Sequence, residues 1–75
     1  MPIEITAVMN KGENEDDKLI LEVKKDGDNP AEVCVSRLSG EEIVNLEHLT
    51  AEEKEWLAAN VPFVISLVDA MRRPN

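Results

Sequence analysis

The chain has 75 residues and a formal net charge of -8, from 16 acidic and 8 basic side chains. This acidic excess repels phosphate backbones and anionic lipid headgroups, so we expect neither direct nucleic-acid binding nor membrane binding. With one cysteine and one histidine, the chain cannot form an internal disulfide or a structural zinc site, and small domains without such staples often oligomerise.

Three segments alternate between apolar and polar residues, which is the pattern of a half-buried strand. The apolar faces are Ile3, Ile5, Ala7 and Met9 in 2–9, Leu19, Leu21 and Val23 in 18–25, and Ala31, Val33 and Val35 in 31–38. A polar loop separates the first two segments. The sequence DGDNP separates the second and third, and Gly27 is expected to supply a positive φ there.

Residues 39–49 allow two interpretations. The pair Ser39-Gly40 is a hairpin turn signal and is followed by β-branched residues, which favours a fourth, edge strand over about 41–47. Ser39 and Glu42 also match the capping box that begins a helix, so a short helix is the alternative.

The C-terminal third is typical of helix. Thr50 and Glu53 form a second capping box, and alanine-rich sequence follows it. Pro62 interrupts this pattern, because a proline inside a helix lacks the N–H donor and costs about 3 kcal/mol. We therefore predict two helices, about 51–59 and 62–72, with Asn60 capping one of them.

These elements predict a single small α+β domain spanning 1–75. Its antiparallel meander of three or four strands would be covered on one face by the two C-terminal helices. The second helix is apolar around more of its circumference than packing against one sheet requires. Phe63, Leu67 and Met71 are therefore candidate partner-binding residues, and a homodimer is favoured over a monomer.

No motif for enzymatic chemistry is present: nucleotide-binding, hydrolase and zinc-protease patterns are all absent, and the acidic runs do not match a calcium loop. His48 is expected to be an exposed loop residue. Cys34 lies within a strand without a basic neighbour, so an inert thiol is expected, either buried or on the less buried sheet face. We predict no catalytic residue, cofactor or metal.

The function expected from these features is that of a non-enzymatic adaptor or accessory module that binds another protein or itself. Small size and acidity are typical of bacterial and phage accessory proteins, and no motif points to a particular family. The N-terminus lacks the features of a secretory signal, and residues 61–71 are too short to span a bilayer, so a cytoplasmic location is expected.

The alternative is an inhibitor that imitates nucleic acid and occupies a basic protein cleft. Its carboxylates would come from the acidic segment 41–55, namely Glu41, Glu42, Glu52, Glu53 and Glu55. A solvated helix start and a charged strand edge would explain the same residues without a binding function.

Overall fold

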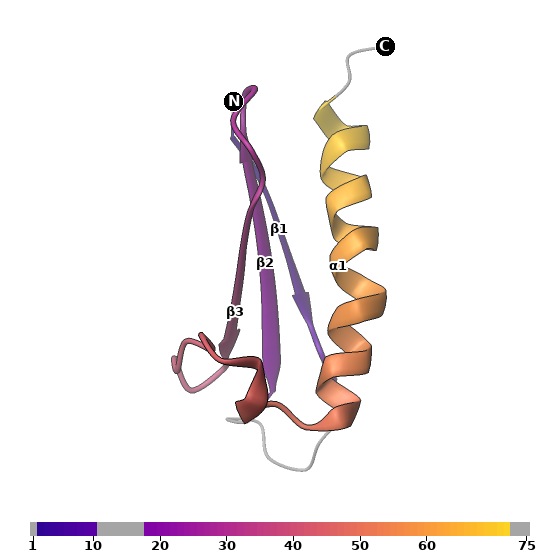
Figure 1. Ribbon diagram of the computed structural model, residues 1–75. Helices are drawn as coiled ribbons and strands as arrows, with labels where there is room; N and C mark the ends of the chain where they lie inside the picture. Colours follow the sequence, from indigo (N-terminus) through magenta and orange to yellow (C-terminus); the bar gives the residue numbers. More distant parts are fainter. Residues whose placement is uncertain (1, 11–17, 73–75) are drawn as a thin grey trace.

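The computed structural model describes residues 2–10 and 18–72. In the described part of the chain, three strands precede a short 3-10 helix and one long α-helix (Figure 1). The elements are β1 (Pro2–Val8), β2 (Leu19–Asp26), β3 (Glu32–Arg37), η2 (Leu46–His48) and α1 (Ala51–Arg72). The sheet is an antiparallel meander in the order β1-β2-β3, and α1 lies along one face, so the predicted α+β class is confirmed.

Strand alternation determines which side chains form the core. Because successive side chains point to opposite faces of a sheet, the apolar residues predicted for β1 and β2 all face α1. The central strand is the most buried, since it has a strand on each side and the helix above it. The buried core consists of Met9, Leu19, Leu21, Val23, Leu49, Leu57, Val64 and Val68.

The turn between β2 and β3 follows the sequence prediction. Gly27 has φ of 58°, a left-handed conformation that costs glycine little because it has no Cβ. The backbone N–H of Asn29 donates to the carbonyl of Asp26 at 3.1 Å and closes the turn. The predicted loop over 10–18 falls largely outside the described residues.

A fourth strand over 41–47 was expected, and the structure corrects this. Glu42 forms a single bridge with Ser36, and the N–H of Ile43 donates to the carbonyl of Val35 at 2.9 Å. The chain then leaves the sheet, because the side chain of Asn45 accepts a hydrogen bond from the N–H of Glu47 and begins η2. The alternative of a short helix beginning at Ser39 is also wrong, since these residues form a turn and a bridge.

The prediction of two helices is wrong as well, because α1 continues through Pro62. Leu57, Val64 and Val68 form one buried stripe against the sheet, and a break at Asn60 would turn part of that stripe away. The carbonyl that loses its donor belongs to Ala58, which is exposed, so water can hydrate it. Asn60 does not cap a helix end; its side chain donates to the carbonyl of Trp56 at 2.8 Å.

The predicted capping box at the start of α1 is confirmed. The N–H of Glu53 donates to the hydroxyl of Thr50 at 3.1 Å, and the N–H of Thr50 donates to the carboxylate of Glu53 at 2.9 Å. These two bonds satisfy backbone donors that the helix leaves without an internal partner. They also fix the point at which the chain turns from η2 into α1.

Candidate interaction surface

The position of α1 leaves one strand of the sheet largely uncovered. The helix packs on β1 and β2, whereas its contact with β3 is much smaller. Val23 of β2 and Val33 of β3 are directly opposite each other in the register, yet Val23 is 0% exposed and Val33 is 44% exposed. The two valines share a face of the sheet, so the difference comes from what lies above them.

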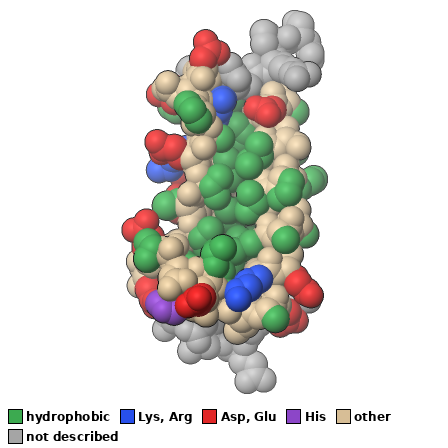
Figure 2. Space-filling model, viewed as in Figure 1, with side chains coloured by type: hydrophobic (Ala, Val, Ile, Leu, Met, Phe, Trp, Pro, Cys, Tyr) green, Lys and Arg blue, Asp and Glu red, His purple; other side chains and the backbone are tan. Residues whose placement is uncertain are grey.

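Between β3 and α1 there is an apolar groove of about 490 Å³. Figure 2 shows hydrophobic side chains gathered along the middle of this face, between the strands on one side and the helix on the other. The groove is lined by Val33, Val35, Leu46, Lys54, Leu57, Ala58, Val61 and Pro62. Among these described lining residues, Lys54 alone carries a charge.

The three apolar residues proposed from the sequence as partner-binding are accessible but lie on a different part of the helix. Phe63, Leu67 and Met71 are 60%, 38% and 63% exposed. Each residue advances about 100° around a helix, so Phe63 lies roughly 140° from Ala58, which lines the groove. The helix therefore has two apolar flanks, separated by the stripe that packs on the sheet.

Sequence reasoning missed the groove as a site. The apolar alternation of β3 was recognised, but two helices were expected to cover that face of the sheet. The facing residues Ala58 and Val61 lie close to Pro62, where a break in the helix was predicted. Because two helices were expected, the groove was not predicted.

One of the acidic candidates, Glu53, forms an ion pair that stabilises the fold. The carboxylate of Glu53 accepts from the Arg37 guanidinium in a bidentate pair, at 2.8 and 3.3 Å. This pair, reinforced by the hydrogen bonds from Thr50 and opposed by burial, lowers the pKa of Glu53 below 4.5. The interaction fastens the end of β3 to the start of α1.

The remaining acidic candidates are exposed. Glu41 and Glu42 directly follow the turn after β3, and Glu52 and Glu55 lie on the first turns of α1. Because Arg37 and Glu53 join these two regions, the four carboxylates lie toward one end of the molecule. All four of these residues are exposed to solvent.

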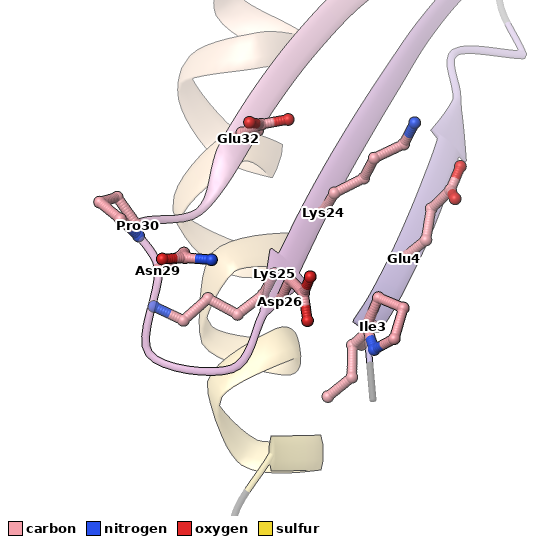
Figure 3. A pocket seen from close by; sticks show the side chains of 9 residues that line it. Ile3, Glu4, Lys24, Lys25, Asp26, Asn29, Pro30 and Glu32 are labelled. Carbon is pink, nitrogen blue, oxygen red and sulfur yellow. The ribbon is translucent and has the colours of Figure 1, made fainter.

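A second hollow, of about 300 Å³, lies at the opposite end of the sheet, beside the turn between β2 and β3 (Figure 3). Lys24 faces Glu4 on one neighbouring strand and Glu32 on the other. Opposite charges paired across strands in this way stabilise a sheet. Strand pairing accounts for the charged residues around this hollow, and they do not converge on a position for a ligand.

The single histidine and the single cysteine of the chain are both exposed. His48 is exposed, as expected, but it lies in η2 and not in a loop. Cys34 is exposed on the sheet face away from α1, which was one of its two predicted positions. In the described ranges, no three His, Cys, Asp or Glu side chains are placed to share a metal ion. The same residues include no helix with the length and hydrophobicity needed to cross a membrane.

Comparisons with protein-family models, with curated proteins and with solved structures gave no match for this chain. The assignment of function therefore depends on the geometry of the chain itself.

Proposed function

We propose that this protein is a non-enzymatic interaction module that binds another polypeptide through the apolar groove between β3 and α1. The observation that carries the proposal is the contrast between Val23 and Val33, which are paired in the sheet but differ in exposure by 44%. A chain with net charge -8 that leaves a continuous apolar surface open has a surface suited to a partner.

The chemistry of the groove supports binding over catalysis. Small-molecule and catalytic pockets place a few polar groups where they converge on a ligand. Among the described residues that line this groove, Lys54 contributes one ammonium at the edge and the others contribute hydrocarbon. A surface of this kind suits an apolar helix or strand from a partner.

Imitation of nucleic acid is the competing function. One observation favours mimicry: the Arg37–Glu53 pair brings Glu41 and Glu42 toward the end of the molecule that also carries Glu52 and Glu55. The same pair weakens it, because the charge of Glu53 is already neutralised by Arg37. The groove is a continuous apolar surface lined by β3 and α1, whereas the four remaining carboxylates are exposed side chains on two separate segments.

The test is affinity capture from an extract of the native host, using three forms of the protein at low and high salt. Ala58→Glu places a charge in the groove, and Ala59→Glu places the same charge on a neighbouring exposed position that does not line it. We expect Ala58→Glu to lose the bound protein, and the wild type and Ala59→Glu to retain it at high salt. Binding that disappears with salt and is insensitive to Ala58→Glu would identify nucleic-acid mimicry instead.

A further inference from the structure

The groove side of α1 carries a stripe whose two ends have opposite charge. Lys54, Ala58, Val61, Ile65 and Asp69 follow one another at spacings of four, three, four and four residues, which keeps them on one side of a helix. Within the described residues, the side chains of Lys54 and Asp69 make no ion pair. They are separated by about 22 Å along the helix axis, too far to meet within one chain.

A second copy of the same helix would bring these charges together. In an antiparallel pair with its two-fold axis between Val61 and Pro62, Lys54 of each chain lies opposite Asp69 of the other. The same symmetry places the small Ala58 opposite the larger Ile65, so the apolar centre is complementary in size. Each of these contacts occurs twice, as an isologous interface requires.

We propose that the occupant of the groove is a second copy of this chain, with the two α1 helices antiparallel and paired in this register. This inference depends on the proposed function, since it names the partner that the groove binds. Antiparallel helices also align their dipoles favourably, with the acidic first turns of one helix directed away from those of the other.

The experiment is sedimentation of the wild type and of charge-reversed variants over a range of micromolar and higher concentrations. We expect a two-chain species for the wild type and a dissociation constant raised at least about tenfold by Lys54→Glu or by Asp69→Lys. The double variant Lys54→Glu/Asp69→Lys should return to within a few-fold of the wild type. Both positions tolerate these charges within the helix, because each change suits the dipole at its end of α1.

The single variants separate a specific pair from general repulsion. Asp69→Lys makes the net charge less negative, so general repulsion predicts tighter association, whereas the proposed pair predicts weaker association. Glu41→Lys changes the net charge equally but lies directly after the turn that follows β3, and it should not weaken the dimer. Leu67→Glu, on the other flank of α1, should also leave association unchanged.

Several results would overturn the inference. They are a wild-type monomer at every concentration, a larger open-ended assembly, indifference to both single reversals, failure of the double variant to recover, or a dimer broken by Leu67→Glu alone. None of these results removes the proposed function. That proposal fails separately, if captured partners are indifferent to Ala58→Glu.

Discussion

Val23 and Val33 are both valines, and they lie directly opposite each other on the same face of the sheet. Nevertheless, Val23 is buried and Val33 is exposed. Nothing in their local sequence pattern separates them, because both belong to an apolar alternation. The difference arises from the helix, which lies above β2 and not above β3. A strand pattern therefore reports which face a residue occupies but not whether that face is covered.

The width of the elements explains why one strand is left open. Strands in a sheet are about 4.8 Å apart, and a helix with its side chains is about 10 Å across, so one helix covers about two strands. Two separate helices, which Pro62 led us to predict, could have covered all three strands. The continuous path of α1 through Pro62 is thus the structural cause of the groove.

The sharpest test of this comparison replaces each valine by alanine. Val23→Ala should lower the free energy of unfolding by about 2–3 kcal/mol, because it removes two buried methyl groups and leaves a cavity. Val33→Ala should cost less than about 1 kcal/mol at low protein concentration, since its side chain is partly in water. Urea unfolding of both variants provides the measurement, and equal losses would contradict an open β3.

The same pair of variants sharpens the proposal of a dimer. If a second copy covers β3, the cost of Val33→Ala should rise with protein concentration, because the dimer contributes to stability by mass action. The cost of Val23→Ala should remain high throughout. If the stability cost of Val33→Ala did not change with protein concentration, the dimer contact would lie away from the groove.

Pro62→Ala tests the helix that separates the two regions. Alanine restores the N–H that the Ala58 carbonyl lacks and removes the clash of the proline ring, so the variant should be more stable by about 2 kcal/mol. Circular dichroism should show similar helix content, since α1 already continues through residue 62. A large increase in helix content would show that the helix is broken in solution.

Glu53→Gln tests the ion pair with Arg37 that joins the end of β3 to the start of α1. The amide can still accept from Thr50 but lacks the charge that binds Arg37, and the pair is partly exposed, so we expect a loss of about 1–2 kcal/mol at neutral pH. Thermal unfolding of the variant and the wild type at several pH values provides the measurement.

The pH dependence follows from the lowered pKa of Glu53. A carboxyl whose pKa is lower in the folded state stabilises the fold above its unfolded pKa, near 4.5, and this stabilisation is lost as the pH falls through the folded pKa. Wild type and Glu53→Gln should therefore differ most at neutral pH and converge in acid. A difference that persists unchanged at low pH would assign the loss to altered packing.

The sequence by itself determined the features that depend on neighbouring residues. Alternation located the three strands to within a residue or two at their ends and identified the core residues of β1 and β2. The capping box at Thr50 and the positive φ of Gly27 were also predictable, because each is a local property of backbone and side chain. An apolar helix surface too wide for one sheet was also recognised from the sequence, and Phe63 and Met71 on that surface are exposed.

Only the tertiary structure decided what happens at Pro62 and therefore where the groove lies. The local cost of an interior proline favours a break, but continuous burial of Leu57, Val64 and Val68 against the sheet offsets it, and that burial involves residues distant in the sequence. The bidentate pair of Arg37 with Glu53 likewise joins positions 16 residues apart. Such contacts exist only once strands and helix have packed, which is why the groove could not be located from the sequence pattern.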